Sequence, residues 1–269
     1  MPVPFRYVKH FVTVPVTVGD LRTTFAIDTG VGITCVSNRL AERAGWDPTG
    51  ATMTGRRMSG QEITGPLGRV PPIRLGDHAV DVGATAIFDI AEVAGLEDIE
   101  GFLGLDGFTS TPLTFDYPRK AVLVEDAASL SRRSREGISV EVRVELEEHL
   151  AEAFLSLSLP HVGPVEVEVD TGSSQLILDE GVARAAGADL GPQAVRRIEG
   201  TDETGYRYIR YFGSLQGQIC VTGQPTLSQE GPAIMAQRII YQGLVGDDFL
   251  SRFVVTYDLS RARMIFRRP

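Results

Sequence analysis

The sequence predicts a mainly β protein made of two similar lobes related by a pseudo-two-fold axis. Three observations support this prediction. The 29 glycines and 15 prolines among 269 residues are typical of a chain with many turns and short strands. Apolar and polar residues alternate at several places, which is the pattern of a strand with one buried face. The second half of the chain also repeats the first half at a nearly constant spacing.

The repeat is clearest around two Asp-Thr-Gly triplets. The segment FAIDTGVGITCVSNRLAERAGWD, which begins at Phe25, aligns with VEVDTGSSQLILDEGVARAAGAD, which begins at Val167, at an offset of 142 residues. The same offset aligns GFLGLDGF, from Gly101, with GLVGDDFL, from Gly243. An internal repeat of this kind indicates two copies of one structural unit, so we expect each half to form one lobe.

The boundary between the lobes is expected in the polar, serine-rich segment EDAASLSRRSREG, which begins at Glu125. The segment lacks apolar periodicity, as is typical of a connecting loop. We therefore predict an N-terminal lobe over residues 1–128, a linker over 129–137 and a C-terminal lobe over 138–269. Each lobe then has roughly 130 residues, which is a usual domain size.

The individual elements follow the same repeat. Alternating valines predict strands near residues 14–18 and 140–146, and alternating leucines predict a strand over 155–159. A short helix is expected after each triplet, over residues 38–44 and 180–186. Helices are therefore predicted to be few and short.

Each triplet places an aspartate at the end of an apolar strand, immediately before a turn. The strand would hold the carboxylate, the threonine hydroxyl can bond to neighbouring backbone, and glycine allows a tight turn beside the carboxylate. A single triplet is a weak signal, because these residues are common in ordinary turns. Two triplets in equivalent positions, each followed at the same distance by an apolar-apolar-Gly element, predict that Asp28 and Asp170 face each other between the lobes.

These features resemble the pepsin and retropepsin superfamily of aspartic peptidases. The markers are the two triplets and the elements 102–104 (Phe-Leu-Gly) and 244–246 (Leu-Val-Gly), and the repeat extends the resemblance over nearly the whole chain. The resemblance implies a bilobal acid-protease fold with Asp28 and Asp170 as catalytic residues, and it places each apolar-apolar-Gly element behind a catalytic loop. The residues that it implies as support for these loops are Thr29, Gly30, Thr171, Gly172 and Ser173.

The resemblance also implies that β-hairpin flaps cover the cleft. The candidates are residues 53–64 and 196–207, with Gly60 and Gly200 near the tips and Tyr206 as a candidate substrate contact. For Tyr206, packing between strands is an equally good interpretation.

The residues after the two triplets differ. Ser173 follows the second triplet, and its hydroxyl is placed to bond to Asp170, whereas Val31 follows the first. Pepsin-like enzymes usually carry Ser or Thr at both positions, and retropepsins carry a small apolar residue, so the chain resembles a fused retropepsin dimer with a pepsin-like second triplet. We expect Asp170 to be the resting base and Asp28 the resting acid, with a working range nearer neutral pH than that of pepsin.

The expected activity is that of an aspartic endopeptidase. Two carboxylates a few ångströms apart share one proton and bind a water, so that one takes a proton from the water while the other donates to the scissile carbonyl. This chemistry needs no metal and no other cofactor, and its partner is a peptide or protein substrate. Apolar residues near the triplets favour hydrophobic side chains at the cut site, although core packing is their more common role. These residues are Val31, Ile33 and Leu176.

Two other functions fit the same pattern. One is a catalytically weak or inactive peptide-binding module with the same fold, and the other is a structural dimerisation domain. The presence of both aspartates favours the enzyme over the binding module, since two buried carboxylates at one site are unfavourable without a function. Both half-sites lie in one chain, which argues against the dimerisation domain and predicts a monomer.

Composition excludes several classes of partner. A formal net charge of −9 argues against nucleic acid, which requires a basic surface. No segment has the roughly 20 consecutive apolar residues of a membrane span, and the N-terminus lacks the pattern of a signal peptide. Cys35 and Cys220 have no disulfide or metal-site pattern and are expected to be small buried residues. With no signal peptide pattern either, we predict a cytoplasmic protein, and secretion by another route is the alternative. The histidines are expected on the surface or in loops; they are His10, His78, His149 and His161.

Overall fold

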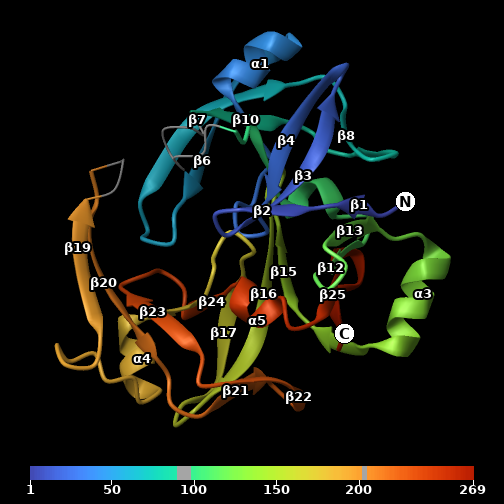
Figure 1. Cartoon of the computed structure of the whole chain (residues 1–269). Helices are drawn as coiled ribbons and strands as arrows, with labels where there is room; N and C mark the ends of the chain where they lie inside the picture. The colour runs from blue at the N-terminus through green and yellow to red at the C-terminus, as the bar shows by residue number, and fades with distance from the viewer. Residues whose placement is uncertain (90–97, 202–204) are drawn as a thin grey trace.

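The computed structural model describes residues 1–89, 98–201 and 205–269, and it is mainly β, as the sequence predicts. Figure 1 shows two lobes, with strands of the N-terminal half at the top of the view and most strands of the C-terminal half at the bottom. Each lobe has its own sheet, and a third sheet contains strands from both halves. This arrangement confirms the predicted bilobal fold.

The sheet of the N-terminal lobe has ten strands within the described residues. Its order is β6-β7-β10-β5-β11-β4-β3-β8-β9, and β2 pairs with β3 beside this path. The strands are β2 (Arg6–Val8), β3 (Phe11–Val18), β4 (Leu21–Ile27), β5 (Cys35–Ser37), β6 (Asp47–Arg56), β7 (Glu62–Arg69), β8 (Ile73–Leu75), β9 (His78–Val80), β10 (Thr85–Phe88) and β11 (Gly101–Leu103). Because β4 pairs with β3 on one side and with β11 on the other, the strand that leads to Asp28 is hydrogen-bonded along both edges.

The sheet of the C-terminal lobe repeats this order strand for strand. It runs β19-β20-β23-β18-β24-β17-β16-β21-β22, and β15 pairs with β16 beside this path. The strands are β15 (Arg143–Leu146), β16 (Ala151–Leu159), β17 (Gly163–Val169), β18 (Leu176–Asp179), β19 (Arg196–Thr201), β20 (Arg207–Ser214), β21 (Gln218–Val221), β22 (Gln224–Glu230), β23 (Ala233–Gln237) and β24 (Gly243–Val245). The repeat in the sequence is therefore also a repeat of topology.

The third sheet joins the two halves. It has the order β1-β13-β12-β25-β26-β14, so three strands come from each half and the junction is the antiparallel pair β12–β25. The strands are β1 (Val3–Pro4), β12 (Leu113–Asp116), β13 (Ala121–Val124), β14 (Ile138–Glu141), β25 (Val254–Asp258) and β26 (Arg263–Arg267). Thr114 of β12 lies opposite Thr256 of β25, and these residues are 142 positions apart. The approximate two-fold axis therefore passes between them.

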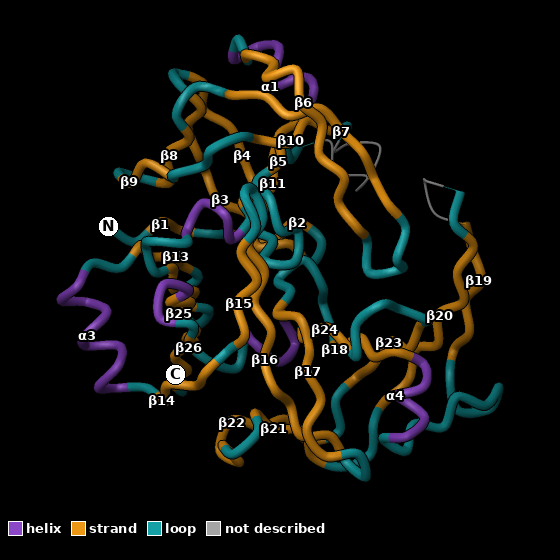
Figure 2. The backbone as a smooth tube through the Cα atoms, turned by 180° about the vertical axis from the view of Figure 1, so that it is seen from behind, coloured by secondary structure: helices purple, strands orange, loops and turns teal. Residues whose placement is uncertain are grey.

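The predicted linker is helical rather than irregular. Residues 129–136 belong to helix α3 (Ala127–Glu136), which lies beside the shared sheet in Figures 1 and 2. The helix begins with a capping box, in which the Ser129 amide donates to the Asp126 carboxylate at 2.7 Å and the Asp126 amide donates to the Ser129 hydroxyl at 2.9 Å. Only Leu130 and Arg133 of the helix are buried. Such a short buried face leaves little apolar periodicity in the sequence.

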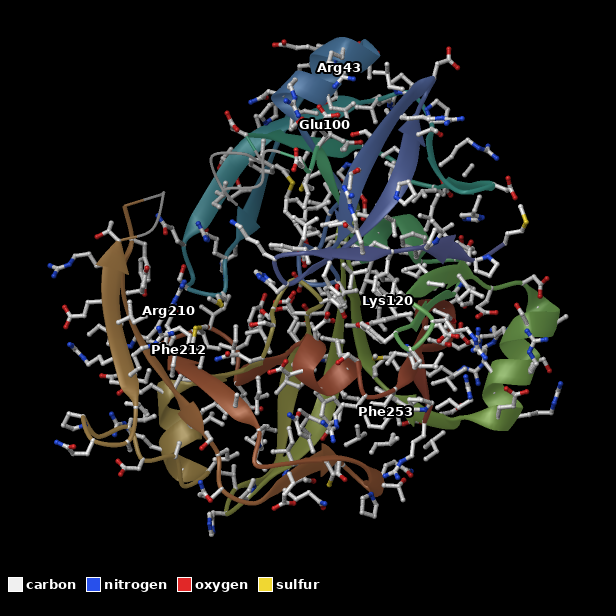
Figure 3. The ribbon with its side chains drawn as sticks, viewed as in Figure 1. Arg43, Glu100, Lys120, Arg210, Phe212 and Phe253 are labelled. Atoms are coloured by element: carbon white, nitrogen blue, oxygen red, sulfur yellow. The ribbon has the colours of Figure 1, made fainter. Side chains whose placement is uncertain are left out.

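Short helices follow both triplets, as predicted. They are α1 (Asn38–Ala44) and α4 (Glu180–Ala185). The described residues also form the short helical segments α5 (Asp247–Leu250), η1 (Leu105–Phe108) and η2 (Leu259–Arg261). Arg39 and Arg43 of α1 each donate to the carboxylate of Glu100 at 2.8 Å. Figure 3 labels Arg43 and Glu100 near the top of the N-terminal lobe. These ion pairs hold α1 against the lobe.

A large hydrophobic core extends through both lobes, and one smaller buried cluster lies in each lobe. The first cluster consists of Ala26, Ile33, Cys35, Leu67, Ala84, Ala86, Ile99 and Phe102. The second cluster consists of Ile177, Met235, Ile239 and Leu244, with Met58, Phe212 and Tyr241 packed against it. Cys35 is buried as predicted, whereas Cys220 is only half-buried, and both thiols are free.

Candidate active site

Asp28 and Asp170 occupy equivalent positions at the ends of β4 and β17. Parallel pairing of β4 with β11 lets the Asp28 amide donate to the carbonyl oxygen of Leu103 at 3.0 Å. Parallel pairing of β17 with β24 lets the Asp170 amide donate to the carbonyl oxygen of Val245 at 3.0 Å. The two apolar-apolar-Gly elements therefore run beside the strands that carry the aspartates, where the sequence places them.

Thr29 and Thr171 connect the two aspartate loops directly. The Thr29 amide donates to the Thr171 hydroxyl at 3.1 Å, and the Thr171 amide donates to the Thr29 hydroxyl at 3.0 Å. Each hydroxyl then donates to a carbonyl of the other lobe, from Thr29 to Val169 at 2.5 Å and from Thr171 to Ile27 at 2.9 Å. The sequence predicted bonds to neighbouring backbone, but these bonds cross between the lobes. Because both side chains are completely buried, the bonds fix the two loops against each other away from the protein surface.

Glycines bring each carboxylate against the opposite loop. The Gly30 amide donates to Asp28 at 3.0 Å, and the Gly172 amide donates to Asp170 at 2.8 Å. A Cβ atom at Gly30 would lie 2.6 Å from the Asp170 Cγ, and one at Gly172 would collide with the Asp28 carboxylate. Both positions therefore require glycine for the two aspartates to approach each other.

The two carboxyl groups have different surroundings. Removal from water raises the pKa of Asp28 well above its usual range, and the charge of Asp170 and a hydrogen bond between the two carboxyls raise that pKa further. Amide groups of Gly30 and Val31 act in the opposite direction. The hydroxyl of Ser173 donates to Asp170, and valine offers Asp28 no such donor. The proton of the pair is therefore favoured on Asp28.

His10 reaches this site, which the sequence did not predict. It lies in the turn between β2 and β3, and its Nε2 is 2.8 Å from the carbonyl oxygen of Gly172. Its ring also packs on Phe11, with ring centroids 4.1 Å apart. The N-terminal lobe thus contacts the aspartate loop of the C-terminal lobe. The repeat carried no signal for this contact, because Thr13 pairs with Ala26 and Phe154 with Glu168, so the residue equivalent to His10 is Ala151.

The first predicted flap, residues 53–64, lies in the hairpin formed by β6 and β7. Gly60 is in its turn with φ 84°, a conformation that favours glycine. The Ile240 amide of the C-terminal lobe donates to the carbonyl oxygen of Met58 at 2.9 Å. Figures 1 and 2 both show this hairpin extending from one lobe toward the other. Its tip therefore contacts both halves of the molecule.

The second predicted flap, residues 196–207, covers β19 and the start of β20. Gly200 lies within β19, opposite Tyr208, and a Cβ atom there would be 2.5 Å from the Tyr208 hydroxyl oxygen. The glycine thus accommodates a neighbouring side chain within the hairpin. Residues 202–204 lie outside the described residues, so the tip itself is not described. Tyr206 is half-buried beside them, and its contact with substrate stays a prediction.

Comparison with known proteins supports the interpretation of the first half. A search of curated proteins finds no match to this chain. Within the described residues, no helix has the length and apolar character to cross a membrane. Residues 14–106 match a family model described as aspartyl protease. This range contains Asp28, its triplet and the element 102–104, so the match supports an aspartyl protease family for the part of the chain that carries the first half of the site.

Proposed function

We propose that the protein is an aspartic endopeptidase that hydrolyses peptide bonds with a water molecule activated between Asp28 and Asp170. The observation that carries the proposal is the close approach of the two aspartates, each of which lies against the glycine of the opposite triplet, together with the raised pKa of Asp28. A pair of carboxyls that shares one proton at the working pH is the state that this chemistry requires. The family match to residues 14–106 supports protease function in general.

The proposed reaction uses both carboxyls in opposite roles. The Asp170 carboxylate takes a proton from the water as its oxygen attacks the scissile carbonyl carbon, while protonated Asp28 donates to the carbonyl oxygen. The resulting tetrahedral diol collapses when the C–N bond breaks: Asp170 gives its proton to the leaving nitrogen, and one hydroxyl of the diol returns its proton to Asp28 as the carbonyl of the acid product forms. Protons and bonds balance without a metal or a covalent intermediate.

The subtype of peptidase and the monomeric state belong to the same proposal. The two triplets and the duplicated topology support a single-chain enzyme of pepsin or retropepsin type. One chain provides both aspartates, which supports a monomer. A cytoplasmic location stays a prediction from the sequence.

The test is incubation of the purified chain with a diverse peptide library between pH 3 and pH 8, with and without a statine-type transition-state analogue. We expect cleavage that the analogue inhibits, and a decrease of about 10²–10⁴-fold in Asp28→Asn and in Asp170→Asn. Asp126→Asn is the matched control, because it makes the same chemical change at the exposed cap of α3, where asparagine also caps well.

Three outcomes separate the interpretations. Cleavage that survives in either active-site variant contradicts the mechanism. Tight binding of the analogue without cleavage supports a peptide-binding module instead. Absence of both contradicts a peptide-binding cleft altogether.

A further inference from the structure

Glu168 is a buried carboxyl next to the catalytic pair that the proposed reaction does not use. It lies on β17, two residues before Asp170, so both side chains are on the same side of the strand. Only 2% of Glu168 is exposed, and its Oε1 atom has no hydrogen-bond partner among the residues that the structure describes. A buried polar atom without a partner is unfavourable by about 1–3 kcal/mol, so it requires an explanation.

The other buried glutamates of the described residues have arginine partners. Glu100 is 6% exposed and accepts hydrogen bonds from Arg39 and Arg43. Glu125 is 4% exposed and accepts a hydrogen bond from Arg133 at 2.8 Å. The chain therefore compensates buried glutamates elsewhere with cations. Glu168 differs, because its Oε1 lacks a donor.

The duplication shows that the fold itself does not require an acid at this position. The equivalent residue in the N-terminal lobe is Ala26, which is completely buried in the first cluster. On the two neighbouring strands, Ala26 is paired with Thr13 of β3 and Phe102 of β11. Glu168 is paired in the same way with Phe154 of β16 and Leu244 of β24. The surroundings are thus similar, but only the C-terminal lobe places a carboxyl there.

We refer to Glu168 with its register partners Phe154 and Leu244, and with the neighbouring Glu152 and Tyr241, as the Glu168 pocket. The rings of Phe154 and Tyr241 pack with centroids 5.8 Å apart. Leu244 and Tyr241 belong to the second cluster, against which Met58 of the β6–β7 hairpin also packs. Apolar walls around an acid suit a lysine or arginine, whose methylene groups pack on apolar surface while the charged end meets a carboxylate.

Glu152 connects this pocket to the first aspartate loop. The Ala151 amide donates to the carbonyl oxygen of Gly32 at 2.8 Å, and a Cβ atom at Gly32 would lie 3.4 Å from the Glu152 Oε1. Burial and the charges of Glu145 and Glu147 raise the pKa of Glu152, whereas Arg143 lowers it. The two acids of the pocket therefore lie beside the aspartate loops of both lobes.

The tip of the hairpin that bridges the lobes lies next to the Glu168 pocket. Met58 at its tip accepts the Ile240 amide, and Ile240 directly precedes Tyr241. A Cβ atom at Gly60 would lie 2.9 Å from the Ile240 side chain, so the tip packs closely on this segment. A substrate side chain can reach Glu168, which is 2% exposed, only if the residues that cover it move apart.

We propose that the Glu168 pocket selects a lysine or arginine side chain of the substrate, next to the bond that is cut. The inference rests on the proposed peptidase function, and it defines Glu168 as a specificity-determining residue. It differs from the expectation of a hydrophobic preference, which stays a prediction for the half-buried Val31, whereas Leu176 lies in the main core and Ile33 in the first cluster.

The raised pKa of Glu168 is consistent with a site that binds a cation. Burial raises the pKa of Glu168 well above its usual range, and the charges of Asp170, Glu152, Asp28 and Glu145 raise it further. A bound ammonium or guanidinium group offsets both causes, because it pairs with the carboxylate and compensates the neighbouring negative charges.

The direct test measures binding with peptides that contain a statine-type isostere and are not cut. Lysine and norleucine are compared at each position that flanks the isostere, because norleucine has a similar chain without the charge. With the wild-type protein at pH 7, we expect lysine to bind about tenfold or more tightly at one of the positions. In Glu168→Gln this preference should fall to about twofold or less.

Two controls make the result specific. Glu141→Gln removes the same charge from an exposed position on β14 and should retain the full preference. Thermal unfolding of Glu168→Gln checks that the variant is folded. An unchanged lysine preference in Glu168→Gln, or a norleucine preference in the wild-type protein, overturns the inference.

The peptide-library cleavage assay separates this inference from the proposed function. Cleavage without enrichment of Lys or Arg beside the cut bond overturns the pocket and leaves the peptidase in place. Binding that depends on lysine and Glu168, without cleavage, supports the pocket and overturns the peptidase. Neither binding nor cleavage overturns both.

Discussion

Thr114 and Thr256, at equivalent positions of the two halves, face each other across the junction of the lobes with their hydroxyl oxygens 2.7 Å apart. Both side chains are buried, so each hydroxyl depends on the other for a hydrogen bond. We expect Thr114→Val to lower the free energy of unfolding by about 1–3 kcal/mol, because it leaves the Thr256 hydroxyl buried without its partner.

The double variant Thr114→Val/Thr256→Val should lose less than the sum of the two single variants, since it removes both polar groups together. Urea unfolding of all four proteins measures this coupling. The exposed pair Thr54–Thr64, with oxygens 2.8 Å apart, provides a matched control, for which Thr54→Val should have little effect. Additive losses at the junction contradict the proposed dependence.

Val31→Ser is expected to narrow the pH range of activity from its alkaline side. Burial and the charge of Asp170 raise the pKa of Asp28, so Asp28 keeps its proton to a higher pH. A serine hydroxyl that donates to Asp28 favours the charged form and lowers this pKa. The alkaline limb of kcat/KM should therefore move down by roughly 0.5–1 pH unit, which corresponds to one hydrogen bond. Val31→Ala removes the same methyl groups without adding a donor, and an equal shift in that variant contradicts the explanation.

Glu168→Gln is expected to stabilise the protein increasingly as pH rises. The folded-state pKa of Glu168 lies above the unfolded value of about 4.3, so the folded state retains the proton longer. Stability is then unaffected below this value and falls as pH rises toward the folded-state pKa. The glutamine variant lacks this loss, so its advantage should grow from nearly zero near pH 4 to about 1–3 kcal/mol at pH 7. Urea unfolding at several pH values measures it, with Glu141→Gln as a control whose difference should not change with pH.

His10→Phe should lower kcat by roughly threefold to tenfold with little change in KM, because it removes one hydrogen bond to the loop of Asp170 but retains an aromatic ring on Phe11. His10→Gln retains a donor and should recover most of the activity. Steady-state kinetics of both variants distinguish this positioning role from a general loss of structure. Equal kinetics for the two variants contradict a role for the hydrogen bond.

Much of the fold was predictable because the second half of the chain repeats the first half. The constant offset between Asp28 and Asp170 correctly predicted two similar lobes, and short helices follow both triplets as expected. Helix α3 was not predicted, because it buries only Leu130 and Arg133 and depends on a capping box that local composition obscures. The pairing of β12 with β25 was also not predicted, since strand partners distant in sequence leave no local pattern.

The candidate site was predictable in its residues but not in its contacts. The triplets named Asp28 and Asp170, whereas the bonds between Thr29 and Thr171 depend on how two lobes meet. Gly200 was expected near the tip of a hairpin, since glycine is common in turns. It lies inside β19 instead, where the missing side chain makes room for Tyr208. Glu168 could have been noticed in the sequence, because the repeat aligns this acidic residue with Ala26 in the first half.

The junction between β12 and β25 has a register that is complementary to itself, since Leu113 faces Tyr257 and Phe115 faces Val255 at mirrored positions. Two separate molecules of the N-terminal half would present identical edges with the same geometry, and their encounter would depend on concentration. Helix α3 connects the halves covalently and turns that encounter into an intramolecular one. The paired aspartates should therefore persist at any dilution at which the chain stays folded.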